Sequence, residues 1–255
     1  MTARSLDALR EEVLEANRAL VAAGLVTLSF GNASGVDREA GVMVIKPSGV
    51  AYDQLRPADL VVVALGDERV VDGTLHPSSD TPTHAVLYRR FPTVGGIVHT
   101  HSAFASAWAQ AGRSIPHLGT THADHFDGPV PVTRALTTDE VEGDYERETG
   151  EVIVELVTAL EADPLRMPAA LVRSHGPFAW GRSASEAVRN AIALEAVAAM
   201  AYRSLALEPG IGPIDDRLLA RHFDRKHGPR ATYGQDQPEA GSAASRRSDS
   251  TRRST

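Results

Sequence analysis

Hydrophobic residues recur at helical spacing near the start of the chain. From Leu6 to Leu20 a hydrophobic residue returns every three or four positions, after Ser5 and ahead of Gly24. This spacing gives a helix one apolar face, serine is a favoured N-cap, and glycine commonly ends a helix. The pattern predicts an amphipathic helix that begins near Leu6 and ends by Gly24.

Three short apolar and β-branched runs follow this helix. They are LVTLSF at 25–30, GVMVIKP at 41–47 and DLVVVAL at 59–65. Clusters that favour turns, containing Gly-Asn, Asp-Arg and Pro-Ser-Gly, separate them. The runs therefore predict a meander of antiparallel hairpins rather than βαβ units.

The rest of the chain alternates helical and strand-like patterns. Thr81 is expected to be the N-cap of a helix over residues 81–90, with Pro82 at its first position. Ser183 and Glu186 form a capping-box pattern that opens a long helix. The other expected elements are a strand at 95–101, a helix from about 102, a helix within 139–162, and two strands within 169–181 that are broken at Gly176-Pro177.

This order of elements predicts an α/β fold with an α+β-like layered arrangement. Helices are expected to flank a central, mostly antiparallel sheet. Residues 1–234 are expected to form this single domain. Residues 235–255 consist largely of Ser, Arg and Ala with almost nothing to bury, so a disordered tail is predicted there.

Composition narrows the chemistry that the chain can perform. Its 255 residues include ten histidines and no cysteine, so disulfides and thiol catalysis are excluded and a transition-metal site must use His, Asp and Glu. The formal net charge of −7 argues against nucleic acid as the main partner. The sequence shows no signal-peptide pattern and no apolar run long enough to cross a membrane, which predicts a cytoplasmic protein without a membrane partner.

Two histidines stand one residue apart in the expected strand at 95–101. Alternate side chains of a strand share a face, so His99 and His101 are expected to point together. His175 also ends an apolar strand, and Asp80 precedes a helix, so these two could complete a metal site of nitrogen and oxygen ligands. The alternative is that the histidines are packing or surface residues; spacing also leaves open three competitors, His84, His122 and His125.

Several longer motifs resemble one enzyme family. The segments LSFGNASGVDRE, VIKPSGVAYD, PSSDTPTHAVLYRRFP, GGIVHTHS, GTTHADHF and SHGPFAWG are similar to L-ribulose-5-phosphate 4-epimerases, members of the class II aldolase and epimerase superfamily. The likeness extends from about Leu6 to Gln235 and implies a class II aldolase-like fold. It implies that a divalent metal, zinc with manganese as the alternative, is bound by His99, His101 and His175 with Asp80 as a further ligand.

The resemblance also implies a pocket for the phosphate of a phosphorylated ketopentose. Hydroxyls and backbone N–H groups at a helix N-terminus stabilise an anion, which agrees with serines placed just ahead of a helix. Lys46 would place its ammonium near the substrate. The implied substrate-binding residues are Gly31, Asn32, Lys46, Ser48, Gly49, Ser78 and Ser79.

The implied reaction inverts C4 of L-ribulose 5-phosphate to give D-xylulose 5-phosphate. It proceeds by retro-aldol cleavage, rotation of the aldehyde and re-addition, for which Asp124 and Tyr233 are the implied acid/base groups. In the family this tyrosine reaches the site of a neighbouring subunit, which implies a homotetramer with shared active sites. Thr120, Glu146 and His222 match positions that support the shared site, whereas His125 stands where a larger aromatic residue is expected.

Four alternatives remain beside this interpretation. Fuculose- and rhamnulose-phosphate aldolases share the fold and metal but have a glutamate where this chain has Asp80. A methylthioribulose-phosphate dehydratase fits the THADH and TYGQ motifs less well. An adducin-like non-enzymatic domain would not need the metal and acid/base residues, and a metal-storage role would leave the phosphate motifs unexplained. The sequence does not decide between arabinose and ascorbate catabolism.

Overall fold

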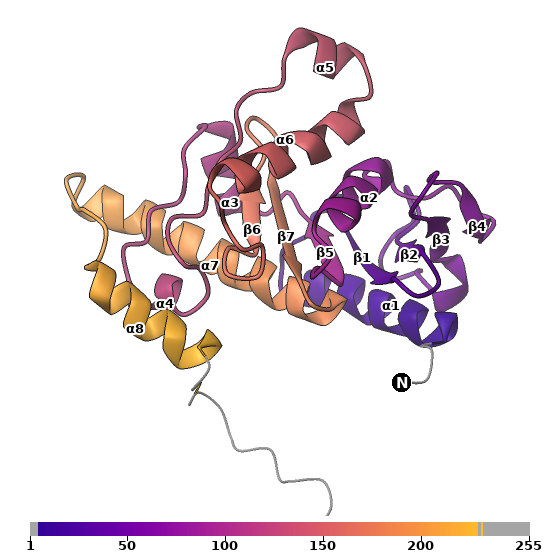
Figure 1. Ribbon diagram of the computed structural model, residues 1–255, viewed down its shortest axis with the longest axis horizontal. Coiled ribbons are helices and arrows are strands. Elements are labelled where there is room, and N and C mark those ends of the chain that lie inside the picture. The colour runs from indigo at the N-terminus through magenta and orange to yellow at the C-terminus, as the bar shows by residue number, and fades with distance from the viewer. Residues whose placement is uncertain (1–4, 229–230, 232–255) are drawn as a thin grey trace, which may run out of the picture.

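Seven strands form one antiparallel sheet in the computed structural model, which describes residues 5–228 and Ala231. The strands are β1 (Asn32–Asp37), β2 (Val42–Ile45), β3 (Val61–Ala64), β4 (Val70–Asp72), β5 (Gly96–His99), β6 (Ala169–Leu171) and β7 (Pro177–Gly181). Their order in the sheet is β4-β3-β2-β1-β5-β7-β6, and each neighbouring pair is antiparallel (Figure 1). The predicted fold class of an antiparallel sheet flanked by helices is confirmed.

Helices cover both faces of this sheet. One face packs against α1 and α7, and the other against α2 and α6 (Figure 1). The described helices are α1 (Leu6–Ala22), η1 (Pro57–Asp59), α2 (Thr81–Arg90), α3 (Ala103–Gln110), α4 (Thr120–Ala123), α5 (Thr138–Glu142), α6 (Tyr145–Ala159), α7 (Ala184–Leu207) and α8 (Asp216–His227).

The alternation of side chains in β2 shows why both faces are buried. Val42 and Val44 lie in the hydrophobic cluster that contains α1 and α7 residues. Met43 and Ile45 lie in the cluster that contains α2 and α6 residues. Because successive strand residues point to opposite faces, an uninterrupted apolar run serves two cores at once.

Most of the predicted elements are confirmed. The first helix, the helix over residues 81–90, the helix after Ser102 and the long helix after Ser183 all lie where the patterns place them. The two strands around Gly176-Pro177 are also present. One detail was wrong, because α2 has Asp80 rather than Thr81 as its N-cap residue.

The predicted strand at 25–30 was wrong. These residues form no strand, and β1 begins just after them, within a segment that the sequence suggested was partly a turn. The backbone turns at Leu28, which has a φ of 57° and an 81% exposed side chain, and Phe30 is 50% exposed. Hydrophobic side chains that face solvent give no core contacts to hold an extended strand.

Strand β1 is buried although its sequence is polar. The Ser34 hydroxyl lies 2.7 Å from His84 Nδ1 and 2.8 Å from the Tyr88 hydroxyl, so its polarity is satisfied inside the protein. A Cβ on Gly35 would lie 2.9 Å from the Leu9 side chain and 3.0 Å from that of Val13. Glycine is therefore needed here for α1 to pack closely on the sheet.

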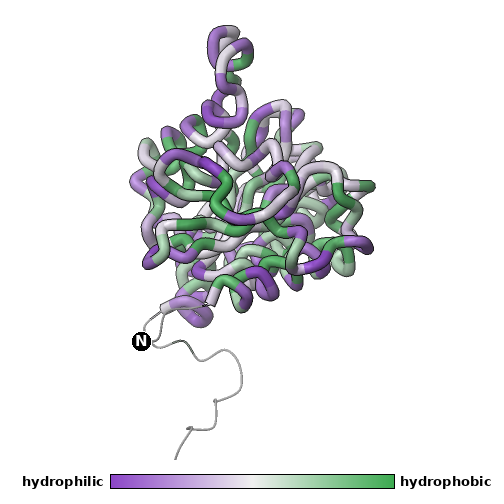
Figure 2. The backbone as a smooth tube through the Cα atoms, turned by 90° about the vertical axis from the view of Figure 1, so that its right-hand side faces the viewer, coloured by the Kyte–Doolittle hydropathy of each residue, from purple (hydrophilic) through white to green (hydrophobic). Residues whose placement is uncertain are grey.

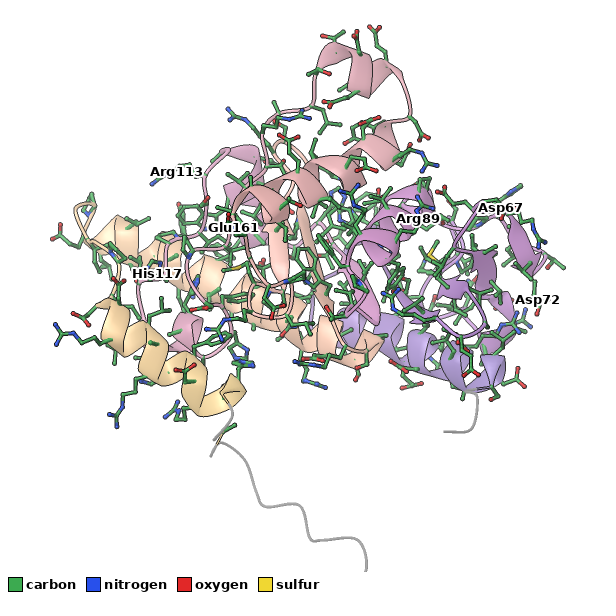
Figure 3. All side chains as sticks on the ribbon, viewed as in Figure 1. Asp67, Asp72, Arg89, Arg113, His117 and Glu161 are labelled. Atoms are coloured by element: carbon green, nitrogen blue, oxygen red, sulfur yellow. The ribbon has the colours of Figure 1, made fainter. Side chains whose placement is uncertain are left out.

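Charged residues protect the exposed β4 edge of the sheet. Asp67 and Asp72 lie at that end of the molecule (Figure 3), and Arg10 of α1 donates to the Asp72 carboxylate at 2.7 Å. Charges on an edge strand disfavour pairing with another chain.

At another side of the molecule the mostly hydrophilic helix α5 projects away from the body (Figures 1 and 2). None of the helices in the described ranges is long and apolar enough to span a bilayer.

Candidate active site

Strand pairing brings three loops together at one end of the sheet. Asn32, the first residue of β1, pairs with His99, the last residue of β5. His99 in turn pairs with Phe178 near the start of β7. The loop before β1, the segment after β5 and the loop before β7 therefore meet at the same place.

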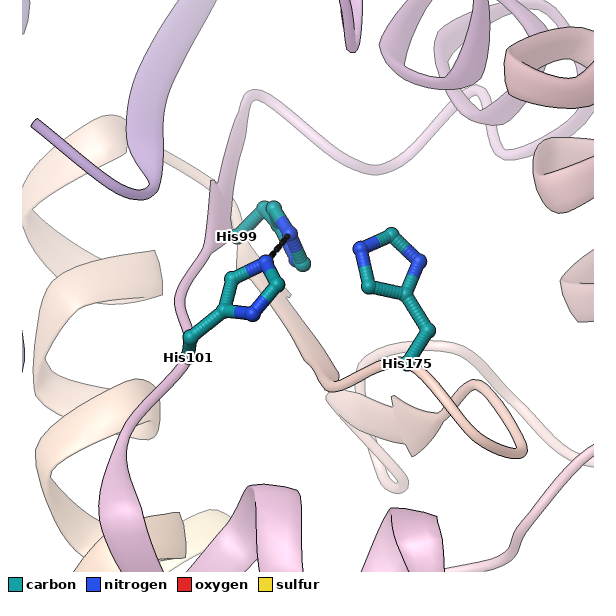
Figure 4. Close-up of side chains that lie close together, drawn as sticks. All are labelled: His99, His101 and His175. Atoms are coloured by element: carbon teal, nitrogen blue, oxygen red, sulfur yellow. Dashed lines mark hydrogen bonds between the residues drawn. The ribbon is translucent and has the colours of Figure 1, made fainter.

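Three histidines face one another there (Figure 4). His99 ends β5, His101 follows two residues later beyond the end of the strand, and His175 lies in the loop before β7. One nitrogen from each ring lies within 4.8 Å of the other two. Among the residues that the structure describes, this histidine trio is the one group of His, Asp or Glu gathered closely enough to share a metal ion.

The chemistry of the trio fits a divalent metal. The Pro177 carbonyl lies 3.0 Å from His99 Nδ1 and can only accept, so Nδ1 carries the proton and the His99 Nε2 lone pair faces His101 Nε2 at 3.0 Å. Burial, with a smaller effect of His101, lowers the pKa of His99 to about 3. Burial and the other two histidines lower that of His175 to about 4. Neutral imidazoles are the form that binds metals such as zinc.

Asp80 lies beside the histidine trio, in the same pocket. Asn32 Nδ2 donates to its carboxylate at 2.6 Å, which holds one oxygen toward β1. Its role as a fourth metal ligand stays a prediction. Of the competing histidines, His84 is fully buried against Ser34, and His122 lies 2.7 Å from the Gly128 carbonyl.

All the predicted phosphate-site residues share this pocket with the histidine trio. Its volume is about 380 Å³. Backbone hydrogen bonds join two of its loops, from Ser78 N to Lys46 O at 3.0 Å and from Ser48 N to His76 O at 2.9 Å. The predicted residues that line the pocket are Gly31, Asn32, Lys46, Ser48, Gly49, Ser78, Ser79, Asp80, His99, His101 and His175.

Gly31 has a structural reason to be glycine in addition to its predicted contact with substrate. Its φ is 85°, in the left-handed region, and a Cβ there would lie 2.6 Å from the His99 carbonyl oxygen. A side chain would therefore strain the backbone and push the loop away from the histidine trio.

Lys46 has a nearly buried side chain that is 2% exposed. Its Nζ donates to the Pro47 carbonyl at 3.2 Å and lies 4.7 Å from the centre of the Tyr52 ring. Burial lowers the pKa of the Lys46 ammonium. Within the described part of the chain, no carboxylate lies within ion-pair distance of it, so an anionic substrate would supply the missing counter-charge.

Lys46→Met is expected to lower kcat/KM for a phosphorylated substrate by roughly 10- to 100-fold, the value of a hydrogen bond to a charged group. The free energy of unfolding is expected to stay the same or rise, because methionine fills similar space without a buried charge. Steady-state kinetics and urea unfolding measure the two effects. A loss of stability with unchanged kcat/KM would show that Lys46 is structural.

Asp124 lies away from this pocket within its own chain. It follows α4, and its Oδ1 lies 3.0 Å from His222 Nδ1 and 3.0 Å from an Arg225 nitrogen, both on α8. Burial raises the pKa of the Asp124 carboxyl, but the hydrogen bonds from His222 and Arg225 outweigh it, so the pKa lies below its usual value. Asp124 is therefore a carboxylate at neutral pH. Tyr233, the other predicted acid/base group, lies outside the described residues.

Three residues were suggested by the sequence to support the shared site. One lies in the pocket of the histidine trio, and the other two lie near Asp124. Glu146 lines the pocket of the histidine trio, Thr120 begins α4, and His222 contacts Asp124. Sequence reasoning missed Tyr145, which also lines the pocket and contacts His175. Its position at the start of a helix gave no sign of this contact, which depends on how α6 packs beside the sheet.

The chain matches the family model of the class II aldolase and adducin N-terminal domain over residues 11–202. It is 55% identical over 227 residues to L-ribulose-5-phosphate 4-epimerases UlaF from Salmonella typhi and from Salmonella paratyphi A, covering 89% of this chain and 98% of each relative. The match thus covers most of this chain and nearly the whole length of these relatives.

Solved structures show the same fold. An L-fuculose 1-phosphate aldolase is 22% identical with a TM-score of 0.71, covering 85% of this chain and 95% of that one. The L-fuculose-1-phosphate aldolase of Thermus thermophilus is 24% identical with a TM-score of 0.63, covering 81% of this chain and 100% of that one. At this identity the likeness concerns the fold and not the substrate.

Proposed function

The chain belongs to the family of class II aldolase and adducin N-terminal domains, and we propose that it is an L-ribulose-5-phosphate 4-epimerase, an isomerase. The observation that carries this proposal is the 55% identity to relatives of that name over 98% of their length. The pocket that joins a histidine trio to a lysine and several serines supports it.

Inversion at C4 requires a bond to carbon to break. The ketone of L-ribulose 5-phosphate is at C2 and does not make the C4 hydrogen acidic. Cleavage of the C3–C4 bond leaves glycolaldehyde phosphate and the enediolate of dihydroxyacetone. The aldehyde then rotates, and re-forming the bond on its other face inverts C4 while its hydrogen stays in place.

The histidine trio would hold the divalent metal, for which we propose zinc, with manganese as the alternative. When bound, the metal supplies Lewis-acid stabilisation of the negative charge that develops on the C2 and C3 oxygens. His99 is preorganised for this task, since its bond to the Pro177 carbonyl holds the ring in one orientation.

Pocket residues outside the histidine trio bind the phosphate in this proposal. Lys46 provides positive charge, and the hydroxyls of Ser48, Ser78 and Ser79 provide hydrogen bonds. These groups keep the aldehyde fragment in the pocket while its carbonyl rotates. Retention of the fragment separates an epimerase from an aldolase.

The C4 oxygen must lose a proton for cleavage and regain one after re-addition on the other face. Two acid/base groups are therefore needed, and we assign these roles to Asp124 and Tyr233. Asp124 does not line the pocket of its own chain, and α8 holds it elsewhere. It would consequently act in the pocket of a neighbouring copy, within a homotetramer in the cytoplasm.

Incubation of the metal-loaded protein with L-ribulose 5-phosphate tests the function. We expect D-xylulose 5-phosphate to form in a coupled assay and a chelator-treated sample to be inactive. Substrate deuterated at C4 is expected to keep its deuterium, because the C4–H bond never breaks.

Other outcomes of this experiment would contradict the proposal in distinct ways. Accumulation of glycolaldehyde phosphate would show an aldolase that releases the fragment. Loss of deuterium would exclude retro-aldol chemistry. Absence of any product from protein that demonstrably holds metal would show that the substrate is wrong.

A further inference from the structure

Tyr145 is the first residue of α6, and its side chain lines the pocket of the histidine trio. Its hydroxyl lies 3.3 Å from His175 Nδ1, and the two ring centres are 6.1 Å apart. No other described side chain hydrogen-bonds the His175 ring. Tyr145 is thus the partner of a proposed metal ligand.

Two buried threonines hold the backbone around Tyr145. The Thr149 hydroxyl donates to the Tyr145 carbonyl at 2.8 Å within α6. The Thr83 hydroxyl of α2 donates to the carbonyl of the next residue, Glu146. Thr149 is 1% exposed and Thr83 is fully buried. The Thr83 hydrogen bond holds the start of α6 against α2. The backbone position from which the Tyr145 side chain extends into the pocket is therefore fixed.

The two sides of the His175 ring have different surroundings. Figure 4 shows Nε2, the ring nitrogen farther from the backbone, directed toward His99 and His101. The other nitrogen, Nδ1, is the atom that contacts the Tyr145 hydroxyl. For Nε2 to offer a lone pair to a metal, Nδ1 must carry the proton of the neutral ring, and that proton needs an acceptor.

His99 shows the same arrangement with a different acceptor. Its Nδ1 lies 3.0 Å from the Pro177 carbonyl, and its Nε2 faces the trio. Partners of this kind fix the orientation and tautomer of a metal-binding histidine, and their loss typically weakens metal binding by about 10- to 100-fold.

We propose that Tyr145 is a positioning residue that accepts the Nδ1–H of His175 and thereby holds His175 Nε2 toward the metal. This inference rests on the proposed metal site of the histidine trio. Tyr145 touches neither the metal nor, in this role, the reacting atoms. Its effect on metal binding comes from orienting the His175 ring.

Tyr145→Phe tests the proposal because it removes the hydroxyl and keeps the ring. The full chain loaded with zinc is mixed with an excess of a chromogenic chelator, and both the rate of zinc release and the equilibrium partition are measured. We expect zinc to bind about 10-fold more weakly in the variant. Protein loaded with cobalt instead is expected to show a changed visible absorption spectrum, which reports ligand geometry.

Tyr52→Phe is the matched control. The Tyr52 hydroxyl donates to the Gly31 carbonyl at 2.7 Å beside the same pocket and contacts no histidine of the trio. Zinc release from this variant is expected to match the parent, and thermal unfolding of the three metal-free proteins shows that each variant is folded.

The outcomes distinguish the inference from the function on which it rests. If the parent binds zinc through the histidine trio and Tyr145→Phe releases it within about twofold of the parent rate, Tyr145 is a packing residue and the inference is overturned. If the parent itself does not retain zinc or cobalt, the proposed metal site fails and the inference fails with it.

Discussion

Replacing His99 by asparagine is expected to lower kcat/KM for L-ribulose 5-phosphate by about 10³-fold or more and to leave the protein without tightly bound zinc. His99 is 2% exposed. Its Nδ1 contacts the Pro177 carbonyl, and its Nε2 faces His101. Lewis-acid stabilisation is worth several kcal/mol, and each 1.4 kcal/mol corresponds to about a factor of ten in rate. The coupled assay and elemental analysis of the purified protein measure the two effects.

Two further variants separate metal loss from misfolding. His101 is exposed, so His101→Asn is expected to lose zinc and activity while its unfolding temperature matches that of the metal-free parent. His117 lies near α7 and α8 in Figure 3 and does not line the pocket of the trio, so it provides a histidine control, and His117→Gln is expected to keep its zinc. A His99→Asn protein that retained both zinc and turnover would show that the trio does not hold the catalytic metal.

Asp124→Asn is expected to lower kcat by about 10²- to 10⁴-fold, the usual contribution of a positioned acid/base group. Its zinc content is expected to match the parent, because Asp124 contacts His222 and Arg225 rather than the histidine trio. Mixing this variant with His99→Asn subunits under conditions of subunit exchange is expected to restore about a quarter of the parent activity, since random assembly gives that share of intact shared sites.

The complementation experiment tests the proposed sharing directly. Each variant alone is the baseline, and differently tagged subunits show by co-purification that mixed oligomers have formed. Mixed oligomers without restored activity would mean that Asp124 does not serve a neighbouring pocket. A monomeric parent with full activity would contradict the proposed homotetramer as well.

Local patterns in the sequence determined most of the helices and strands. Helical spacing located α1, and the capping-box pattern of Ser183 and Glu186 located α7. These features depend on neighbours within a few positions, which is why they can be read from one chain. The same reasoning wrongly predicted a strand at 25–30, because Leu28 lies in a turn and its side chain faces solvent. The residue types alone do not show which side chains are exposed.

Residue types and spacing also determined which side chains could perform the chemistry. Ten histidines without cysteine limited a metal site to nitrogen and oxygen ligands. The spacing of His99 and His101 placed two of them together, although His101 lies beyond the end of β5. The longer motifs, through their resemblance to one family, supplied the remaining candidates. Eleven of the predicted site residues, His99 and His101 included, line one pocket.

Only the tertiary structure decided which of these residues meet. His175 joins the trio because β5 and β7 pair in one register, with His99 opposite Phe178. The same structure separated Asp124 from the pocket by bonding it to α8, and it brought Tyr145 to His175 through the packing of α6. Contacts between residues far apart in the chain arise from strand register and helix packing, and these depend on the whole fold rather than on any local pattern.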